Sequence, residues 1–304
     1  MRHLIDINIL EEGIPKKLLE TAKYYKTKGR GLLEGAPLLG RTLAMIFEKP
    51  STRTRISFEV AMTELGGSAI YLDSKSMQMG RGESIKDTAK VLSRYLDGIM
   101  IRALSHETLT DMAKYSSIPV INGLTNLSHP CQILADIMTF EENKGPIEDK
   151  IVAWVGDGNN MANSWIHAAS VFNFNLKLAC PNGRHPNEEI IKWAKSKDAN
   201  VEIFKEPNKA VYQADAVVTD TWVSMGDDVL KDPQKVFGNY QVDLDLFNKA
   251  KQDAIFMHCL PAHRGEEVTK EVIDGPRSVV WDEAENRLHI QKAILSWAIA
   301  DKLV

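Results

Sequence analysis

A strand-to-helix turn around Pro50 constrains this chain more than any other stretch. Residues 41–47 form a short apolar run with the length and residue types of a buried strand, which Pro50 ends. Ser51 and Thr52 are residue types that favour the N-cap, and a helix is expected over about residues 54–65. The stretch therefore predicts a helix that begins at the carboxyl end of a strand.

The first turn of this predicted helix is rich in hydrogen-bond donors. The backbone N–H groups and the positive dipole end of a helix N-terminus favour an anion. Hydroxyl and guanidinium groups add donors that suit a phosphate, whereas a merely capped helix would need fewer. The turn has none of the glycines of a nucleotide-hydrolysing P-loop. We therefore predict a phosphate site that comprises Ser51, Thr52, Arg53, Thr54 and Arg55.

Predicted strands alternate with predicted helices along the whole chain. The strands are expected at residues 41–47, 68–72, 97–102, 118–122, 151–155, 176–180, 199–204, 216–219, 254–257 and 278–281. This alternation is typical of an α/β fold with parallel sheets, in which ligands bind at the carboxyl ends of the strands. Arg102 and His129 fall at or just after such ends. They are therefore expected to converge with the predicted phosphate site.

The chain of 304 residues is long enough for two domains of ordinary size. Residues 143–150 are polar, contain Gly-Pro and interrupt the alternation, which marks a domain boundary. We predict two doubly wound domains, residues 1–145 and 146–285, each with a central parallel sheet. A closing helix is expected in residues 286–304, where apolar residues recur at helical spacing.

Composition argues against several kinds of partner. The net charge is −4 and no run of lysine and arginine stands out, which disfavours nucleic acid. No apolar stretch approaches the length of a membrane span, and the first residues lack the apolar core of a signal peptide. The three cysteines form no pattern of a disulfide framework. We predict a cytoplasmic protein that binds neither nucleic acid nor membrane.

A dinucleotide hypothesis arises from Gly156-x-Gly158, which follows a predicted strand. The third glycine position of that motif holds Met161, and the next strand ends at Cys180 and a proline, with no acidic residue for a ribose. The sequence therefore disfavours NAD, and no other cofactor is predicted.

A zinc hypothesis arises from His129, Cys131, His258, Cys259 and His263. Their spacings fit no closed set of zinc ligands, so no metal is predicted. Cys259 could also be a covalent nucleophile. However, neighbouring residues on a strand point to opposite faces, so no Cys–His pair follows from the adjacency of His258.

Four motifs resemble those of the aspartate/ornithine carbamoyltransferase family. Residues 51–55, Ser-Thr-Arg-Thr-Arg, resemble its carbamoyl-phosphate loop, and residues 129–132, His-Pro-Cys-Gln, follow in the family's order. Residues 220–226 and 258–261 resemble the ornithine-specific members in particular. The resemblance spans the chain and implies transfer of a carbamoyl group from carbamoyl phosphate to the δ-amine of L-ornithine. The products would be L-citrulline and phosphate, in arginine biosynthesis or, in reverse, in arginine catabolism.

The resemblance also implies a role for individual residues. Carbamoyl phosphate would be bound by Ser51, Thr52, Arg53, Thr54, Gln78, Arg102, His129, Gln132, Cys259, Leu260 and Arg287. Ornithine would be bound by Asn159, Asn160, Asp220, Ser224 and Met225, and the catalytic residues would be Arg102, His129, Thr54 and Cys259. No cofactor or covalent enzyme intermediate is implied.

The family's architecture implies a carbamoyl-phosphate-binding first domain and an ornithine-binding second domain, with the C-terminal helix crossing back to the first. It further implies a homotrimer or a multiple of trimers, in which Gln78 reaches the site of a neighbouring subunit. From composition alone, the polar loop of residues 73–83 that carries Gln78 could equally be a solvent-exposed loop without a functional role. Arg287 could likewise be part of a surface salt bridge.

Several related activities stay open at this point. An aspartate carbamoyltransferase would need basic residues for a second carboxylate where this chain has residues 220–226 and Cys259. A putrescine or N-acetylornithine carbamoyltransferase would make no use of Asp220 and Ser224 as partners of a free α-amine. A non-catalytic carbamoyl-phosphate or amino-acid binding protein would be expected to lack Arg102 or His129.

Overall fold

A computed structural model describes residues 1–223 and 232–303. The chain forms two compact units: unit 1 comprises Met1–Leu134 and Asn286–Val304, and unit 2 comprises Ala135–Glu285. Each unit is an α/β structure around one parallel sheet, which confirms the predicted fold class. In the described ranges, no helix has the combination of length and apolar character that crossing a bilayer requires.

The sheet of unit 1 has four strands in the order β2-β1-β3-β4. They are β1 (Thr42–Phe47), β2 (Ser68–Asp73), β3 (Gly98–Arg102) and β4 (Val120–Leu124), and all pairs are parallel. The chain adds β2 on one side of β1 and then β3 and β4 on the other. The topological switch point, where such sheets bind ligands, therefore lies between β1 and β3.

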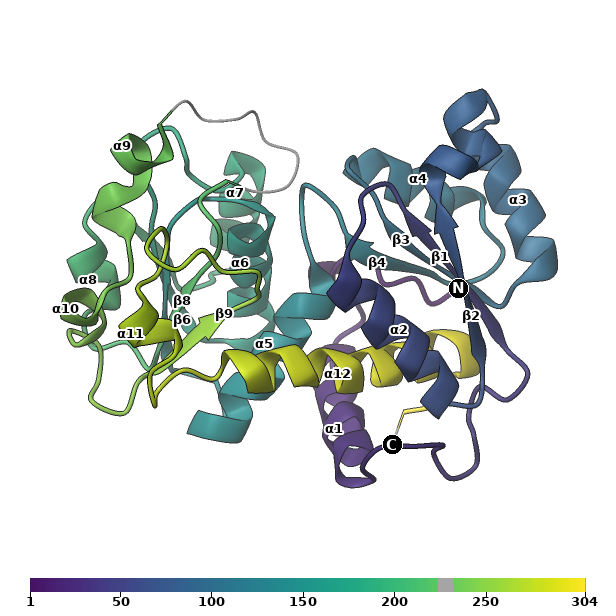
Figure 1. Ribbon diagram of the computed structural model, residues 1–304, viewed down its shortest axis with the longest axis horizontal. Coiled ribbons are helices and arrows are strands. Elements are labelled where there is room, and N and C mark those ends of the chain that lie inside the picture. Colours follow the sequence, from purple (N-terminus) through teal and green to yellow (C-terminus); the bar gives the residue numbers. More distant parts are fainter. Residues whose placement is uncertain (224–231, 304) are drawn as a thin grey trace. The chain divides into compact units, whose positions relative to one another are not determined.

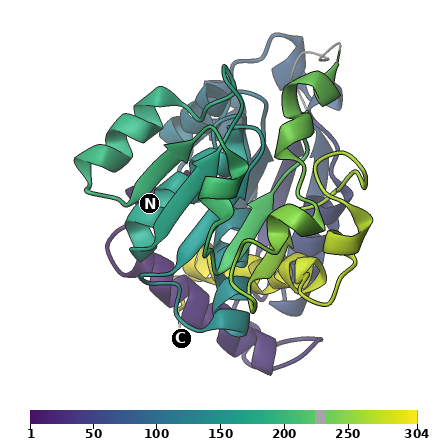
Figure 2. The same cartoon turned by 90° about the vertical axis from the view of Figure 1, so that its left-hand side faces the viewer.

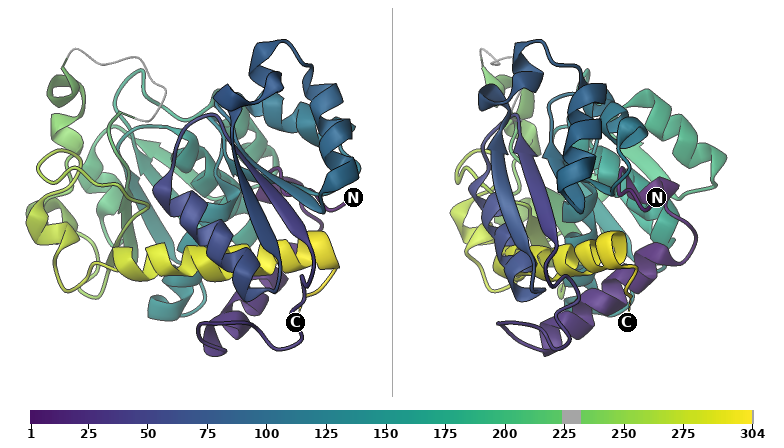
Figure 3. Two further views of the ribbon diagram at one scale, coloured as in Figure 1. Left: turned by 45° about the vertical axis from the view of Figure 1, so that its right-hand side comes forward. Right: turned by 90° about the vertical axis from the view of Figure 1, so that its right-hand side faces the viewer.

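Helices cover both faces of this sheet (Figure 3). They are α1 (Ile14–Thr27), α2 (Thr52–Glu64), α3 (Ile85–Tyr95), α4 (His106–Tyr115), the start of α5 (Pro130–Lys144) and most of α12 (Val280–Ala300), with short 3-10 helices η1 (Ile7–Ile9), η2 (Ser74–Ser76) and η3 (Gln78–Arg81). On one face, α3 and α4 pack with Ile46, Ile99 and Ile101 in a shared core. On the other face, Ile299 of α12 lies against Gly98 of β3. The central strands are buried on both faces, as expected for a parallel sheet.

The sheet of unit 2 has five parallel strands in the order β7-β6-β5-β8-β9. They are coloured teal to green in Figure 2. They are β5 (Ile151–Val155), β6 (Asn175–Ala179), β7 (Val201–Phe204), β8 (Ala216–Thr219) and β9 (Ile255–His258). Its helices include α6 (Asn160–Phe172), α7 (Glu188–Ser196), α8 (Pro207–Val211), α9 (Pro233–Phe237), α10 (Leu244–Phe247) and α11 (Lys270–Ile273), with the 3-10 helix η4 (Gly238–Tyr240). The switch point of this sheet lies between β5 and β8.

One predicted strand is wrong. In the predicted strand at residues 278–281, only Ser278 pairs, through a single bridge to Phe256, and α12 begins at Val280. Asp282 and Glu283 fall in the first turn of α12, where carboxylates stabilise the positive end of the helix dipole. The closing helix therefore begins before the predicted residue 286. The predicted loop of residues 73–83 also differs, because it contains η2 and η3.

Candidate functional site

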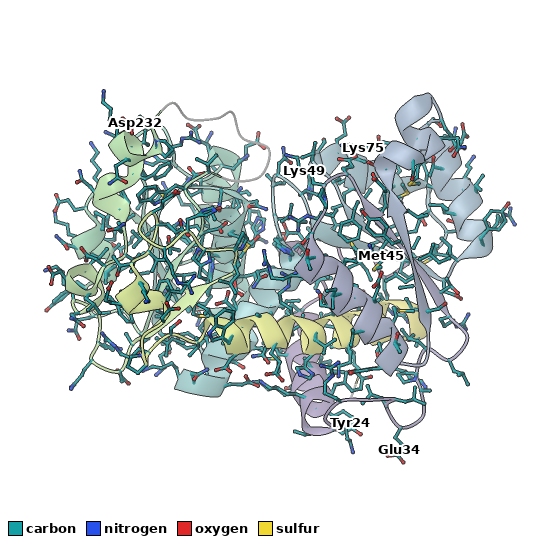
Figure 4. All side chains as sticks on the ribbon, in the orientation of Figure 1. Tyr24, Glu34, Met45, Lys49, Lys75 and Asp232 are labelled. Atoms are coloured by element: carbon teal, nitrogen blue, oxygen red, sulfur yellow. The ribbon has the colours of Figure 1, made fainter. Side chains whose placement is uncertain are left out.

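The predicted phosphate turn adopts the expected strand-to-helix geometry at the end of β1. Ser51 is the N-cap of α2: its Oγ accepts a hydrogen bond from the backbone N–H of Thr54 at 3.4 Å. The same hydroxyl donates to Oγ1 of Thr54 at 3.1 Å. Figure 4 marks the approach to this turn, with Met45 in β1 and Lys49 in the segment that leads to α2. The cap thus holds the Thr54 side chain at the start of the helix.

Two guanidinium groups converge on the Thr54 hydroxyl. Arg287 of α12 donates from Nη2 to Oγ1 of Thr54 at 2.8 Å, and Arg102 at the end of β3 donates from Nη1 at 3.4 Å. Thr54, Arg102 and Arg287 are all buried. Two buried guanidinium groups that meet at one hydroxyl are the donor types that bind a phosphate or carboxylate. The structure therefore excludes the surface salt bridge as the setting of Arg287.

His129 is the third polar group of this cluster. Burial and the positive charges of Arg287 and Arg102 hold the pKa of its imidazole well below its usual value. The ring is therefore neutral near neutral pH and can donate one N–H without adding a positive charge. Its neighbour Cys131 is also buried, which raises the pKa of that thiol to about 12, and its Sγ contacts the backbone oxygen of Asn122 at 3.3 Å. Cys131 is thus a structural residue.

Topology explains why these residues meet. Thr54 follows β1, Arg102 ends β3 and His129 follows β4, and these strands are direct neighbours in the sheet. The residues therefore lie at the carboxyl ends of adjacent strands around the switch point. Arg287 joins them from α12, beside α2 (Figure 1).

The remaining predicted residues of unit 1 surround this cluster less closely. Thr52 and Arg53 are exposed in the first turn of α2, and Gln132 is buried in the first turn of α5. Gln78 is exposed in η3. Arg55 pairs with Glu59 at 2.9 Å and stacks over the ring of Tyr71 at 4.2 Å. Arg55 thus has two partners on the surface of unit 1, and its place among the phosphate donors stays a prediction.

A second cluster lies at the switch point of unit 2. Asn159 is the N-cap of α6: its Oδ1 accepts from the backbone N–H groups of Met161 and Ala162 at 2.9 and 3.2 Å. Its Nδ2 donates to Oδ2 of Asp220 at 2.8 Å. Asn159 follows β5 and Asp220 follows β8, so the two residues bridge the neighbouring strands. Asn160, the first residue of α6, is half-buried.

The carboxylate of Asp220 also holds Cys259. Its Oδ1 accepts from the Cys259 thiol at 3.2 Å and from the backbone N–H of Thr221 at 2.8 Å. Burial, together with the carboxylates of Asp220, Glu283 and Asp136, holds the pKa of the Cys259 thiol well above its usual value. Cys259 is therefore a protonated thiol, which argues against a thiolate nucleophile.

Sequence reasoning missed Asp136 and Glu283 as neighbours of Cys259. A signal was present, because Asp136 lies four residues after Gln132 in α5 and Glu283 lies four residues before Arg287 in α12. Residues four apart share one face of a helix. Glu283 also accepts a hydrogen bond from the backbone N–H of His258 at 2.9 Å, which anchors the end of β9.

The loop after β9 is held by His258. Its Nε2 lies 3.2 Å from Oε1 of the buried Glu267, and its Nδ1 accepts from the backbone N–H of Leu260 at 2.9 Å. Leu260 has a left-handed φ of 56° and precedes a cis peptide bond to Pro261. Both ring nitrogens of His258 thus have partners other than Cys259. Of the residues predicted to bind ornithine, Ser224 and Met225 lie outside the described residues.

Among the described residues, two groups of three potential metal ligands have their ligand atoms within 4.8 Å of one another. They are Asp220, His258 and Cys259, and His263, Glu266 and Glu267. Neither group contains the four ligands of a structural zinc site. In the first group, the Cys259 thiol donates a hydrogen bond to the Asp220 carboxylate.

The fold and these clusters define an α/β protein of two units. Unit 1 carries a cluster of two arginines, a threonine hydroxyl and a histidine that suits an anion, and unit 2 carries a carboxylate–thiol cluster. Family comparisons agree with this class. Residues 2–142 match the carbamoyl-P binding domain of aspartate/ornithine carbamoyltransferase, and residues 148–298 match its Asp/Orn binding domain. The chain belongs to the aspartate/ornithine carbamoyltransferase family, as its motifs predicted.

Similar proteins cover nearly the whole chain. An ornithine carbamoyltransferase of Nitrobacter winogradskyi is 55% identical over 98% of this chain and 97% of its own length. One of Brucella suis is 52% identical over 99% of this chain and 97% of its own length. The solved structure of ornithine carbamoyltransferase from Pyrococcus furiosus has a TM-score of 0.93 and 49% identity, and covers 100% of this chain and 98% of that one.

Proposed function

We propose that this protein transfers the carbamoyl group from carbamoyl phosphate to the δ-amine of L-ornithine, giving L-citrulline and phosphate. The convergence of Arg102 and Arg287 on Thr54, beside a neutral His129, carries the proposal. The relatives described above, which carry the name ornithine carbamoyltransferase, favour ornithine over aspartate, putrescine and N-acetylornithine as the acceptor. They also favour an enzyme over a non-catalytic binding protein.

Unit 1 supplies the carbamoyl-phosphate site in this proposal. Ser51, Thr52, Arg53 and Thr54 hold the phosphate at the N-terminus of α2, where helix dipole and backbone N–H groups add to the side-chain donors. Gln132, in the first turn of α5, binds the carbamoyl amide.

The same unit supplies the stabilisation of the transition state. Attack of an amine on the carbonyl carbon places negative charge on the carbonyl oxygen before phosphate leaves. Arg102, His129 and the Thr54 hydroxyl donate to that oxygen, and one well-placed donor contributes on the order of 3 kcal/mol. The neutral imidazole of His129 donates without repelling the two arginines. The leaving phosphate takes up the proton that the amine loses.

Unit 2 supplies the amino-acid site. Asp220 binds the α-ammonium group of ornithine, together with Ser224, while Asn159 and Asn160 bind its carboxylate and Met225 lines its side chain. The hydrogen bond from Asn159 to Asp220 supports this arrangement, because it orients the carboxylate. The protonated δ-amine has a pKa of about 10 in water. The neutral amine, selected from solution on binding, is therefore the form that attacks, and the proton that passes to phosphate is the one its nitrogen loses after attack.

Cys259 and Leu260, which follow β9, complete the site. We propose that the Cys259 thiol contacts the reacting groups as a neutral hydrogen-bonding group, since its raised pKa keeps it protonated. No step needs a bond between its sulfur and the carbamoyl carbon. Leu260 presents backbone groups to carbamoyl phosphate, and its own N–H is held by His258.

We also propose a homotrimer, or a multiple of trimers, in which Gln78 completes the carbamoyl-phosphate site of a neighbouring subunit. The exposure of Gln78 in η3 supports a role outside its own subunit. A cytoplasmic location is proposed as well, and the three free cysteines support it, since thiols persist in a reducing compartment.

The test is formation of citrulline from carbamoyl phosphate with L-ornithine, beside aspartate, putrescine and N-acetylornithine at equal concentrations. We expect a rate with ornithine far above the others. The Arg102→Met variant should lose citrulline formation. The control Arg41→Gln removes an exposed arginine just before β1 and should form citrulline as wild type does. If the protein binds carbamoyl phosphate but forms no product with any amine, the anion site would stand and the transferase activity would be refuted.

A further inference from the structure

A buried ion pair joins the two helices that carry the anion site of unit 1. Lys292 of α12 donates from Nζ to Oε2 of Glu64, the last residue of α2, at 2.9 Å. Lys292 is 0% exposed and Glu64 is 5% exposed. The other carboxylate oxygen, Oε1, accepts from Nε of Arg30 at 2.5 Å and from the backbone N–H of Gly31 at 3.3 Å. Both oxygens of the Glu64 carboxylate therefore accept hydrogen bonds.

A gain in the stability of the fold does not explain why this ion pair is buried. Removal of two charges from water costs free energy that their attraction in the protein often fails to recover. A well-packed apolar pair of similar volume is frequently as stable or more stable. The best-attested use of buried polar pairs is to fix the register of packed helices. A pair placed between α2 and α12 would fix how far one helix is displaced along the other.

That register matters because both helices reach the anion site. Thr54 lies in the first turn of α2 and Glu64 at its end, while Arg287 and Lys292 are separated by little more than one turn of α12. The contacts Arg287–Thr54 and Lys292–Glu64 thus tie the two helices at two separate points. A shift of α12 by one residue would move Arg287 by about 1.5 Å.

Helix α1 holds α12 by two further bonds. The hydroxyl of Tyr25 donates to Oγ of Ser296 at 2.9 Å, and Nζ of Lys26 donates to Oδ1 of Asn286 at 2.8 Å. These bonds restrain the helix along its length. Neither bond joins α12 to α2, whereas the ion pair and the Arg287–Thr54 contact both do.

We propose that Lys292 and Glu64 are positioning residues of the anion site, which act through Arg287. Their ion pair sets the register of α12 on α2 and so holds the Arg287 guanidinium against Thr54 and the bound phosphate. The inference rests on the proposed function for its kinetic readout, while its binding readout uses inorganic phosphate and is independent of any transfer reaction.

The test is the apolar double variant E64L/K292M, compared with wild type by calorimetric titration with inorganic phosphate. Because the variant exchanges the ion pair for apolar side chains, we expect a folded protein with wild-type helix content. A displaced Arg287 should weaken phosphate binding and raise the KM for carbamoyl phosphate, by about ten- to a hundredfold. The KM for ornithine should change little.

A double-mutant cycle with Arg287→Gln distinguishes positioning from a general structural role. If the pair acts through Arg287, E64L/K292M should cost little further affinity for phosphate in the R287Q background. Losses that add in full would overturn the proposal, as would wild-type phosphate affinity in E64L/K292M. The control R41Q/D97N removes the exposed ion pair between Arg41 and Asp97 and should bind phosphate as wild type does.

Two further results keep the test decisive. If E64L/K292M does not fold, Glu64→Asp retains the charge but shortens the side chain, and the same loss of phosphate affinity is expected on a smaller scale. Unchanged affinity in that folded variant would refute the proposal. If the wild type binds phosphate and the cycle behaves as expected but no citrulline forms, the proposed function fails and the positioning role stands.

Discussion

His129 shows how charge at the anion site is set by neighbouring residues. Burial and the nearby Arg287 and Arg102 lower the pKa of the imidazole, so the folded protein binds no proton there near neutral pH. An unfolded histidine takes up a proton as the pH falls through its ordinary value of 6.5. The unfolded state thus gains protons that the folded state does not, and folding is weakened by acid.

We therefore expect the pH dependence of stability to change in His129→Gln. The free energy of unfolding of the wild type should fall as the pH drops below 6.5, by up to about 1.4 kcal/mol per pH unit from this residue. The variant lacks that contribution and should show a shallower fall in urea unfolding between about pH 7 and pH 5. Identical slopes would show that folding does not lower the pKa of His129.

The same variant should lower the rate of carbamoyl transfer. Loss of one donor to the developing oxyanion reduces kcat by about a hundred- to a thousandfold. Steady-state kinetics at saturating ornithine measure this change. A kcat within a factor of about two of wild type would remove His129 from the oxyanion site.

Cys259 allows a direct test of its charge state. Burial first, and then Asp220, Glu283 and Asp136, raise the pKa of the thiol above the ordinary 9.0. We expect slow alkylation by iodoacetamide near neutral pH, since the thiolate is the nucleophile. In Asp220→Asn the reaction should begin at lower pH, yet still above the ordinary range, because burial persists. Mass spectrometry of the Cys259 peptide over a pH series gives both curves, and coincident curves would contradict the prediction.

Among the elements, α2 and α12 make a testable contribution to acid stability. Burial raises the pKa of Glu64, but hydrogen bonds and charges from Lys292 and Arg30 outweigh it and lower the pKa overall. A carboxyl with a depressed folded pKa contributes stability above its unfolded pKa and loses it as the pH falls through the folded value. Denaturant unfolding of E64L/K292M should therefore lose less free energy than wild type as the pH is lowered through about 4.5. A parallel loss in both proteins would contradict this.

The Gly-x-Gly turn after β5 has a structural explanation in place of a dinucleotide. Gly156 has a φ of 135°, and a Cβ on Gly158 would lie 2.3 Å from the backbone of His185 and Pro186. Gly158→Ala should therefore destabilise unit 2 by about 1–3 kcal/mol, because rigid backbone would have to move. Gly145→Ala, in open space at a φ of 72°, is the comparison and should cost less. Equal costs in denaturant unfolding would refute the close contact.

Sequence reasoning was most successful for central elements and least successful at the margins. The strands at residues 151–155 and 216–219 were predicted to the residue, because short, mostly apolar runs suit buried parallel strands. Residues 278–281 have the same apolar character, but their neighbouring carboxylates favour a helix start. Periodicity cannot separate these outcomes in so short a run.

At the scale of the whole molecule, the sequence allowed the two switch points to be predicted, but not the side-chain contacts around them. The predicted strands placed Thr54, Arg102 and His129 at or just after strand ends. That Arg287 donates to Thr54, across 233 positions of the chain, follows only from the fold. Likewise, Asp220 could be assigned a role from its motif, but its bond to Cys259 required the structure.

The proposed trimer makes a prediction for mixed subunits. Gln78→Ala and Arg102→Met should each be nearly inactive alone if every site needs Arg102 of one subunit and Gln78 of its neighbour. After the two variants are unfolded and refolded together, some sites should contain both native residues, and citrulline formation should reappear. Light scattering checks the oligomeric state of each sample. A trimer with no recovered activity would place Gln78 in its own subunit.

The discontinuity of unit 1 has a consequence for the order in which the protein matures on the ribosome. Glu64 and Thr54 are made early, yet Lys292 and Arg287 emerge only after all of unit 2 has been translated. A nascent chain therefore holds the Glu64 carboxylate without its lysine while unit 2 is already free to fold. The proposed anion site therefore matures after unit 2 has been made, and the growing chain should acquire affinity for phosphate only once Arg287 has joined Thr54.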